Sequence, residues 1–583
     1  MDSFVFNAIA SGVMPPSLPP PIARVAAAAL GLPRIGALYE ELTRANPERP
    51  LVERLLENLE VQIQVSQKDL DHIPRTGPVL VVVNHPSGIL DGAVLGTLLS
   101  GLRADVKILA NHLLATIPEI RELLIPTDVL SGRPAVRSNL SSIRKSVRVL
   151  EDGGLLGVFP AGEVSRFCWR QQSVTDSAWN PATAAILRMA ERRGASVSVV
   201  PMHLKVSNSL LFHAASVLSS RLPTLLLCRE LLNKRGSTVE VRIGSAISAD
   251  KILSLGTDQE RIDYLRWRTY LLASRNAYKP RTSLPMRVRR DRFRPVSDAM
   301  PPEILAKEIG ALAPEKRLAG SAELSTYLAQ AAEIPSTLRE IGRLREITFR
   351  AAGEGTGRAL DLDEFDAHYL HLFVWNHKKQ EVVGAYRLAA TDQVRRLYTA
   401  SLFQYGAEFL ERMGPAIELG RSFVRAEYQR GFQPLLLLWK GIGAFVSRNP
   451  RYRVVFGPVS ISNRYQALSR RLMVSFLERH AWWAELKDLV AARNPFRGPA
   501  EQKTGLDVDD LSAVVSDIDP GQSGIPVLLR QYLRLGGKLV GFNVDPQFAN
   551  VLDGLIVVDL TKTDPKLLDR YLGRAERRWL ETK

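Results

Sequence analysis

The chain has 583 residues, of which 45% are hydrophobic and 24% are charged. This length exceeds the roughly 250–300 residues at which a single hydrophobic core stops growing, so we expect two large domains. The composition is that of a globular protein and excludes a disordered or fibrous chain. Its 77 Lys and Arg residues outnumber 61 Asp and Glu residues, and the resulting net charge of +16 favours an anionic partner, whether nucleic acid, lipid or protein.

Cysteine usage and hydropathy predict where the protein works. Cys168 and Cys228 form neither a disulfide framework nor a zinc-binding spacing, which is typical of a reducing compartment and predicts a cytoplasmic protein without a metal site. The apolar stretch from Ile22 to Leu32 is short and contains Arg24, whereas a spanning helix needs about 20 apolar residues. We therefore expect neither a cleaved signal nor an integral membrane segment.

In the first half, short apolar runs alternate with helical patterns. A helical region that associates with the membrane or caps the domain is predicted at residues 1–70. Strands are predicted at 79–83, 106–109, 155–159 and 197–201, with a helix at 90–99. Strands interleaved with helices at this spacing indicate an α/β domain with a largely parallel sheet, which we place at residues 71–278.

Residues 279–335 are predicted to form a basic, Pro-containing linker, because their first part is rich in Pro and Arg and has no clear period. The basic run from Lys279 to Arg294 is either a solvated connection or a membrane-surface patch, since each basic residue near an anionic leaflet contributes about 1 kcal/mol. A second α/β domain is predicted at residues 336–583, with strands at 369–374, 382–388, 416–424, 453–456 and 555–560, and helices at 432–446 and 525–535.

The clearest motif of the first half is VLVVVNHPSGILDG, from Val79 to Gly92. A buried strand ends in a polar loop, which places His85 at the carboxyl end of a strand, where α/β folds bind ligands. His85 is a candidate general base on a hydroxyl, with Asp91 orienting its imidazole. Six helical positions turn through about 600°, so the two side chains can meet only if the chain between them is not helical. A structural histidine is the alternative.

This motif resembles the signature N-H-x-x-x-x-D of the glycerolphosphate and lysophospholipid acyltransferases, although five residues separate His85 from Asp91 here. Two further blocks follow in the family's order: FPAGEVSR from Phe159 to Arg166, and VVPM from Val199 to Met202. The resemblance covers about 120 residues and implies the glycerolphosphate-acyltransferase-like fold, with His85 and Asp91 as its catalytic pair.

The second block also implies the acceptor-binding residues Gly162, Glu163 and Arg166. The family has Glu where this chain has Ala161 and Thr where it has Glu163, so the site is expected to hold an acceptor without the usual phosphate. Glu163 would bind an ammonium group or, alternatively, pair internally with Arg166. The family's acceptor-site arginine is either Arg133 or Arg137.

Ordered polar blocks also run through the second half: LREITFR at 344–350, DLDEFD at 361–366, VGAYRL at 383–388 and IELGRSFV at 417–424. They resemble those of acyl-homoserine-lactone synthases and lyso-ornithine-lipid N-acyltransferases, over about 220 residues. The resemblance implies a GNAT-like α/β fold and an acyl carrier protein donor. It also implies a pocket for the amine and the acyl donor, lined by Arg345, Asp363, Asp366, Arg387, Glu418 and Arg421.

Acyl transfer to an amine needs a neutral amine, a polarised thioester and a group that takes the proton. Glu418 is the candidate base or proton relay, and a structural pairing with Arg421 or Arg425 is its alternative. Asp363 and Asp366 are interpreted as attracting a cationic amino acid, with a merely exposed acidic surface as the alternative.

Together the halves resemble the bifunctional ornithine-lipid synthases. The second half is expected to join a 3-hydroxyacyl group to the α-amine of ornithine, and the first half to acylate the 3-hydroxyl of that lyso-lipid. Expected partners are acyl carrier protein, ornithine and lipids of the cytoplasmic membrane face, where the protein binds peripherally; no cofactor, metal or nucleic acid is expected. The alternatives are a phospholipid-precursor acyltransferase with an accessory GNAT-like domain, and a non-catalytic membrane-binding protein.

Overall fold

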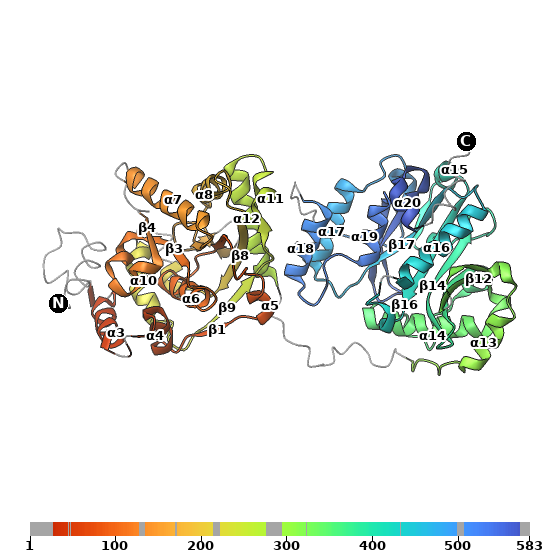
Figure 1. The fold of residues 1–583 in the computed structure, drawn as a ribbon, viewed down its shortest axis with the longest axis horizontal. Coiled ribbons are helices and arrows are strands. Elements are labelled where there is room, and N and C mark those ends of the chain that lie inside the picture. Colours follow the sequence, from red (N-terminus) through yellow and green to blue (C-terminus); the bar gives the residue numbers. More distant parts are fainter. Residues whose placement is uncertain are drawn as a thin grey trace. The chain divides into compact units, whose positions relative to one another are not determined.

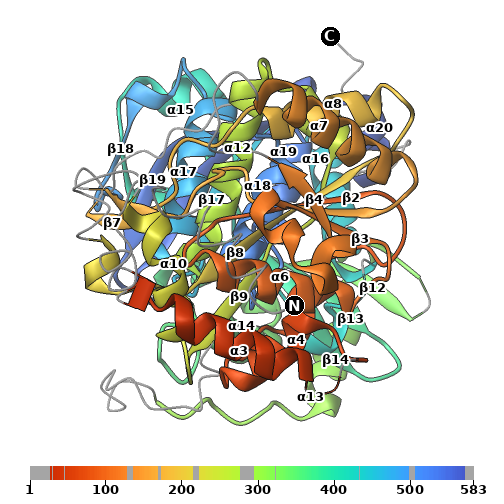
Figure 2. The same cartoon turned by 90° about the vertical axis from the view of Figure 1, so that its left-hand side faces the viewer.

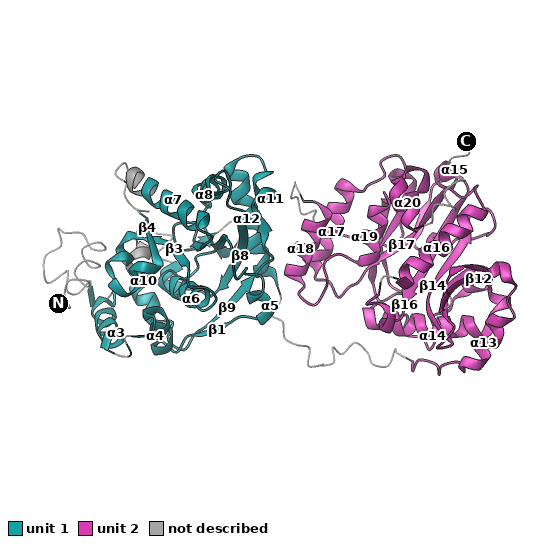
Figure 3. Cartoon of the chain, viewed as in Figure 1, with its two compact units in different colours: residues 1–278 teal, residues 279–583 magenta. Residues whose placement is uncertain are grey.

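The computed structural model describes residues 27–44 except 29, residue 46, and residues 48–127, 135–168, 172–213, 222–275, 294–321, 323–431, 433–497 and 506–571, without the side chains of 135–139 and 222–225. The chain divides into two compact units, residues 1–278 and 279–583 (Figure 3). Both units are α/β and contain sheets of mixed strand direction. Arg133 and nearly all of the basic run, residues 279–293, lie outside the described residues, as does the side chain of Arg137.

The main sheet of the first unit has the strand order β1-β9-β8-β2-β5-β3-β4, with β10 beside β8. Neighbouring strands are parallel except that β9 and β10 run antiparallel to β8. All five residues of β2 are buried at the centre of this sheet, as the predicted strand requires. The strands are β1 (Gln62–Gln64), β2 (Val79–Val83), β3 (Val106–Asn111), β4 (Leu124–Thr127), β5 (Leu155–Val158), β8 (Ser198–Lys205), β9 (Thr238–Ile243) and β10 (Ile247–Ser248).

Helices cover both faces of this sheet (Figures 1 and 2). On one face, α6 (Ile89–Ser100) packs with α4 (Leu51–Asn58) and α10 (Leu222–Leu232), and α3 (Leu32–Arg44) packs with both α4 and α10. On the other face, α8 (Ala182–Glu191) packs with α7 (Ala135–Glu151), α11 (Ala249–Leu253) and α12 (Asp258–Leu271). A short hairpin of β6 (Arg166–Cys168) and β7 (Ser173–Thr175) follows the FPAGEVSR block.

The described part of the predicted N-terminal region, residues 1–70, belongs to the core of the first unit. Leu38 and Leu42 of α3 and Leu51 and Leu56 of α4 lie in the same hydrophobic cluster as Val81 of β2. The segment β1 extends the sheet beside β9, and α5 (Gln67–Leu70) follows it. A separate capping region is therefore wrong for residues 32–70, because their apolar side chains are buried against the sheet.

The second unit is built on a sheet with the order β11-β12-β13-β14-β16-β17-β20-β19. Its neighbours are antiparallel except for β16 and β17, which are parallel. These strands are β11 (Arg317–Gly320), β12 (Leu324–Gln330), β13 (Leu370–Asn376), β14 (Glu381–Ala390), β16 (Ala416–Val424), β17 (Val454–Ile461), β19 (Lys538–Asp545) and β20 (Val551–Asp559). A separate pair joins β15 (Phe403–Tyr405) to β18 (Val490–Ala492).

Two long helices lie on opposite faces of this sheet (Figure 1). The helix α14 (Pro335–Ala352) packs with α13 (Pro302–Gly310) on the face that carries Phe373, whereas α16 (Gln433–Arg448) contacts the neighbouring residue Leu372 through Gly441. Successive residues of a strand point to opposite faces, so the two helices enclose the sheet. The remaining helices are α15 (Glu408–Met413), α17 (Ala467–His480), α18 (Val508–Ile518), α19 (Val527–Arg534) and α20 (Pro565–Tyr571).

The parallel strands β16 and β17 pair only over their first residues. Register runs from Ala416 opposite Val454 to Glu418 opposite Phe456; beyond this point β16 continues along β14 and β17 along β20. Their closest approach requires Gly457, since a Cβ atom there would lie 2.0 Å from the carbonyl oxygen of Leu419. Pairing between the two strands therefore ends after Glu418, near the start of the IELGRSFV block.

The predicted linker is too long at its C-terminal end. Residues 302–335 contain α13, β11 and β12, and Leu305, Ile309, Tyr327 and Ala329 are buried in a core cluster with Phe373. Its proline and charged residues made this stretch resemble a linker. Pro301 and Pro302 instead stand at the start of α13, a position that tolerates proline. Residues 302–335 are thus part of the second unit.

Candidate active sites

In the first unit His85 and Asp91 meet as the motif predicts. The imidazole Nδ1 lies 2.8 Å from Asp91 Oδ2, and Asp91 is buried while His85 keeps 18% of its side chain exposed. Among the described residues nothing hydrogen-bonds to the other ring nitrogen, Nε2. The pair therefore presents a histidine whose orientation is fixed by a carboxylate and whose Nε2 is available to a hydroxyl.

The loop between them is not helical, which confirms the geometric requirement stated above. Asp91 Oδ2 accepts hydrogen bonds from the backbone N–H groups of Ser87 and Gly88, both at 2.8 Å, and the Ser87 hydroxyl donates to Oδ1. Helix α6 begins only at Ile89. Gly88 has φ of +86°, and a Cβ atom there would lie 2.6 Å from Leu227 of α10, so this turn requires glycine.

Two residues that the sequence did not single out hold this loop. Asn84 clamps β8, because its side chain donates to the carbonyl of Leu204 at 3.0 Å and accepts from the Leu204 N–H at 2.7 Å. Asp176 accepts the backbone N–H of His85 at 3.2 Å, the Ser165 hydroxyl and the Trp179 indole N–H. Asn84 was visible in the NHP motif, whereas Asp176 follows a stretch with no recognisable pattern.

The FPAGEVSR block lies beside the histidine. Phe159 stacks on the His85 ring with centroids 4.3 Å apart, and the Ser165 backbone N–H donates to the His85 carbonyl at 2.8 Å. Gly162 has φ of +67° in the turn that follows Phe159. Glu163 forms an ion pair with Arg166 and also accepts the hydroxyl of Ser177. The geometry therefore favours the alternative in which Glu163 is internally paired.

Glu163 offers a direct test of that pairing. For the lyso-lipid O-acylation that the sequence resemblance implies, we expect Glu163→Gln to lower the rate by the same factor on acceptors with and without an ammonium group, because the variant loosens the block rather than a head-group contact. Rates on two matched lyso-acceptors measure this, and the control Arg166→Gln should give the same pattern. A loss at least tenfold larger on the ammonium-bearing acceptor, worth about 1.4 kcal/mol, would show that Glu163 binds the head group.

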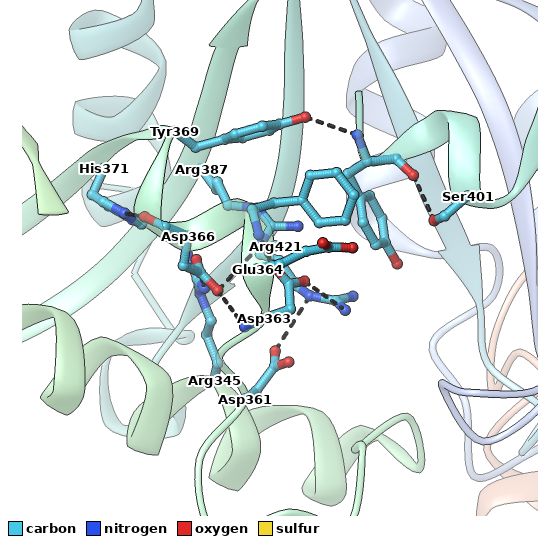
Figure 4. Close-up of polar contacts among 12 residues, drawn as sticks. Arg345, Asp361, Asp363, Glu364, Asp366, Tyr369, His371, Arg387, Ser401 and Arg421 are labelled. Atoms are coloured by element: carbon cyan, nitrogen blue, oxygen red, sulfur yellow. Dashed lines mark hydrogen bonds and ion pairs between the residues drawn. The ribbon is translucent and has the colours of Figure 1, made fainter. Parts of the chain in front are cut away.

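In the second unit the predicted residues form a buried charged cluster (Figure 4). Arg345 Nη1 lies 2.7 Å from Asp366 Oδ1, and Arg387 Nη1 lies 2.6 Å from Asp363 Oδ1 and 3.2 Å from Asp366 Oδ2. Arg421 lies 3.4 Å from Asp361 and 3.8 Å from Asp363. The aspartates come from the loop before β13, the arginines from α14, β14 and β16. Helix, loop and strands thus converge where β16 leaves β17.

Each charge in this cluster has a counter-charge. Burial alone would raise the pKa of Asp366, but Arg345 and Arg387 outweigh it and hold that pKa below its usual range. Burial tends to lower the pKa of Arg421, yet Asp361 and the other nearby acidic groups outweigh it and the pKa is raised. Asp363 and Asp366 are therefore neutralised by arginines, which argues against their predicted attraction of a cationic amino acid.

Aromatic rings pack around the guanidinium groups of Arg387 and Arg421. The Arg387 guanidinium lies 5.1 Å from the ring centroid of Tyr369 and 5.0 Å from that of Tyr398. Arg421, with φ of +49° at a bulge of β16, lies 4.8 Å from Tyr398 and 4.6 Å from Phe548. Buried guanidinium nitrogens without a hydrogen bond remain on Arg345, Arg387 and Arg421, so the cluster has donors left for a bound group.

Glu418 is not paired with Arg421 or Arg425. Its buried carboxylate accepts the hydroxyls of Tyr369 and Thr399 and the backbone N–H groups of Tyr398 at 3.1 Å and Thr399 at 2.7 Å. Arg425 pairs instead with Glu381. A carboxylate that already accepts these bonds is better suited to hold Tyr398 in place than to take a proton. Tyr369 directly precedes β13, whereas Tyr398 and Thr399 lie after β14 at the start of η8 (Thr399–Ser401); none of the three carries a sequence motif.

Within the described parts of the chain, no three His, Cys, Asp or Glu side chains are arranged to hold a metal ion. No helix of these parts is both long enough and apolar enough to cross a membrane.

Comparisons with known proteins divide the chain at the same place. Residues 46–278 match a family model described as an acyltransferase, and residues 344–440 match a model described as an acetyltransferase (GNAT) domain. His85, Asp91 and Glu163 fall in the first match, and the arginine–aspartate cluster falls in the second. Each half therefore carries its own acyltransferase-type domain.

Three relatives show which reactions such sequences catalyse elsewhere. A glycine N(alpha)-acyltransferase of Phocaeicola vulgatus is 31% identical over 44% of this chain and 86% of that protein. An L-ornithine N(alpha)-acyltransferase of Rhizobium meliloti is 28% identical over 44% of this chain and 86% of its own. A lyso-glycine lipid O-acyltransferase of Phocaeicola vulgatus is 27% identical over 34% of this chain and 68% of its own.

Proposed function

Because the chain belongs to the amino acid Nα-acyltransferase family and also carries a second acyltransferase domain, we propose that it is a bifunctional aminolipid synthase. The second unit N-acylates the α-amine of ornithine with a 3-hydroxyacyl group. The first unit then O-acylates the 3-hydroxyl of the lyso-lipid. Support for two steps in one chain comes from relatives named for each step, an N-acyltransferase and a lyso-lipid O-acyltransferase.

The observation that carries the O-acylation step is the His85–Asp91 pair. A 3-hydroxyl within hydrogen-bond distance of Nε2 would lose its proton to the imidazole while its oxygen attacks the thioester carbon of a second donor. The imidazolium then returns the proton to the leaving thiolate. Asp91 stabilises the imidazolium through Nδ1, and the three other hydrogen bonds to Asp91 keep that carboxylate in place.

For the N-acylation step, the support is the position of the arginine–aspartate cluster where β16 leaves β17. Strands that separate expose backbone N–H and C=O groups, which can hydrogen-bond a thioester and its amide-containing arm. Arg421 lies at this point, and its Nε makes no hydrogen bond beyond the 3.4 Å ion pair with Asp361, so its guanidinium is suited to the carboxylate of an amino acid. The second unit would therefore bind the acyl donor and the amino acid acceptor next to each other.

The donor is proposed to be acyl carrier protein, and the protein is proposed to bind the cytoplasmic membrane face peripherally. The chain's net charge of +16 would attract the acidic carrier and anionic lipid. We expect kcat/KM with the acyl carrier protein to fall steeply as salt rises, because exposed charges are screened over roughly 10 Å at 0.1 M salt. Acyl-CoA assayed in the same salt series is the control. A salt-independent rate with acyl-CoA preferred would contradict this donor.

Acceptor identity is tested by competition between amino acids. Purified full-length protein is given 3-hydroxyacyl carrier protein with ornithine, lysine, glutamine and glycine, and the N-acyl products are quantified by mass spectrometry. The proposal predicts the highest kcat/KM for ornithine. A preference for glycine would retain an aminolipid synthase but change its product, and turnover of lysophosphatidate alone would support a phospholipid-precursor enzyme instead.

A further inference from the structure

Buried carboxylates in the second unit form two groups that differ in charge balance. Asp361, Asp363 and Asp366 face the three arginines described above. The second group consists of Glu354, Asp545 and Asp553, which are 8%, 5% and 5% exposed. The cations that act on this second group are Arg421, which acts on Asp553, and Arg464, which acts on Glu354. The second group therefore has an excess of negative charge.

Strand register brings the second group together on one face of the sheet. Asp553 of β20 lies opposite Ser460 of β17 and opposite Asn543 of β19. Directly opposed residues project from the same face, and so does Asp545, two positions after Asn543. The Ser460 hydroxyl donates to Glu354 at 2.9 Å, which ties Glu354 to this face. Because β17 borders the place where β16 separates, the group lies beside the proposed donor site.

Polar groups around Asp553 are left without partners. None of the described residues donates a hydrogen bond to the Asp553 carboxylate. Asn543 is fully buried, and its Nδ2 has no partner, although its Oδ1 accepts the N–H of Asn494 at 2.8 Å. Arg421 Nε makes no hydrogen bond either, although it forms a 3.4 Å ion pair with Asp361. Buried polar groups are nearly always satisfied, so an amide and a carboxylate left open side by side indicate a polar ligand.

The electrostatics of this second group indicate the sign of the ligand's charge. Burial raises the pKa of Asp553, Asp545 and Glu354 raise it further, and Arg421 only partly opposes them, so the pKa lies well above its usual range. Burial raises the pKa of Tyr398, and the negative charges of Asp553 and Asp545 raise it further, although Arg421 opposes them. A cation entering this group would relieve the repulsion between the carboxylates.

We propose that Glu354, Asp545 and Asp553 bind the ammonium group of the amino acid acceptor, and that Asp553 removes its proton. This site rests on the proposed N-acylation. An ammonium held by Asp553 transfers one proton to the carboxylate, and the neutral nitrogen attacks the thioester carbon. The C–N bond forms and the C–S bond breaks; the second nitrogen proton leaves with the thiolate as a thiol, and Asp553 releases its proton to water.

The same assignment explains why Glu418 is not required as the base. Glu418 accepts its hydrogen bonds from Tyr369, Tyr398 and Thr399, whereas Asp553 accepts none from the described residues. A carboxylate with an elevated pKa is also the stronger base near neutral pH. Glu418 then becomes a positioning residue for Tyr398.

The decisive variant is Asp553→Asn, with Asp488→Asn as its control, since Asp488 is exposed in η10 (Lys487–Leu489). We expect Asp553→Asn to lower kcat/KM for the amino acid at pH 7 by at least about 100-fold, the usual size of a general-base contribution. The deficit should shrink as pH rises, because neutral amine becomes abundant without a base. Asp553→Glu should recover part of the rate, and Asp488→Asn should match wild type.

A second variant, Asp545→Asn, tests the site through a shift of the pH profile, which a folding defect alone would not produce. Asp545→Asn removes a negative neighbour and lowers the pKa of Asp553, so the acidic limb of the kcat/KM profile should move to lower pH. An unmoved limb in Asp545→Asn, or an unchanged rate and pH profile in Asp553→Asn, would overturn the site while leaving N-acylation itself intact. Wild-type protein that acylates no amino acid would overturn the proposed function first.

Discussion

A His85→Ala protein is expected to accumulate the singly acylated aminolipid and to make almost none of the doubly acylated product. The imidazole is the group of the first unit placed to take the hydroxyl proton, and loss of a general base typically lowers a rate by 10²–10⁴-fold. Within the described residues, the one side chain that hydrogen-bonds to its ring is Asp91, which is buried and so has no surface for substrate. N-acylation should continue, since the second unit has its own site.

The measurement is O-acylation of a synthetic lyso-lipid, together with N-acylation of the free amino acid, by the same preparation. His72→Gln is the matched control, because His72 Nδ1 bonds the backbone carbonyl of Ile243 at 2.9 Å on β9, which β8 separates from β2. Its O-acylation should stay near that of wild type. If His85→Ala lost N-acylation as well, the assignment of one step to each unit would be wrong.

The second large effect is on stability, at Asp366. An Asp366→Asn protein leaves Arg345 and Arg387 without the carboxylate that lies 2.7 Å and 3.2 Å from them. Removing one partner from a buried ion pair typically costs about 3–5 kcal/mol, because the remaining charge is buried without compensation. We therefore expect the unfolding transition of the second unit to move to much lower urea concentration, with O-acylation by the first unit unaffected.

The pH dependence of this effect has a definite sign. The folded-state pKa of Asp366 is depressed, so its contribution is fully present above its unfolded pKa of about 3.9 and is lost as pH falls through the folded value. The difference between wild type and Asp366→Asn should accordingly be constant near neutrality and shrink below about pH 4. Glu364→Gln is the control, since the exposed Glu364–Arg396 pair is worth at most about 1 kcal/mol. Equal urea midpoints for the two variants would contradict the buried network.

Much of the fold could be predicted because its strands are strongly apolar. The runs at 79–83, 155–159 and 416–424 correspond to β2, β5 and β16, and the helix at 432–446 corresponds to α16. The hydrophobic pattern of a sequence indicates which segments are buried, and these elements are largely buried. It failed at β12, whose residues LSTYLAQ mix polar and apolar side chains because Ser325 and Thr326 are buried with hydrogen bonds.

Some residues of the candidate sites could likewise be predicted from the sequence and others could not. His85 and Asp91 were predictable, since one loop carries both and only its backbone course had to be inferred. The partners of Glu418 were not, because Tyr369 precedes β13 and Thr399 follows β14, and only the folded sheet brings both to β16. Asp553 lies still further away in sequence, and strand register alone places it beside Ser460 and Asn543. Contacts across strands leave no local pattern.

The central claim, two acylations by one chain, is tested most directly in lipid extracts. Wild-type protein and the His85→Ala and Asp553→Asn variants are expressed in a host that makes no aminolipid, and the extracts are analysed by mass spectrometry. The account predicts a diacylated amino acid lipid from wild type, its lyso form from His85→Ala, and a large loss of both from Asp553→Asn. An unchanged aminolipid profile in all three, or new phosphatidate without any acylated amino acid, would contradict it.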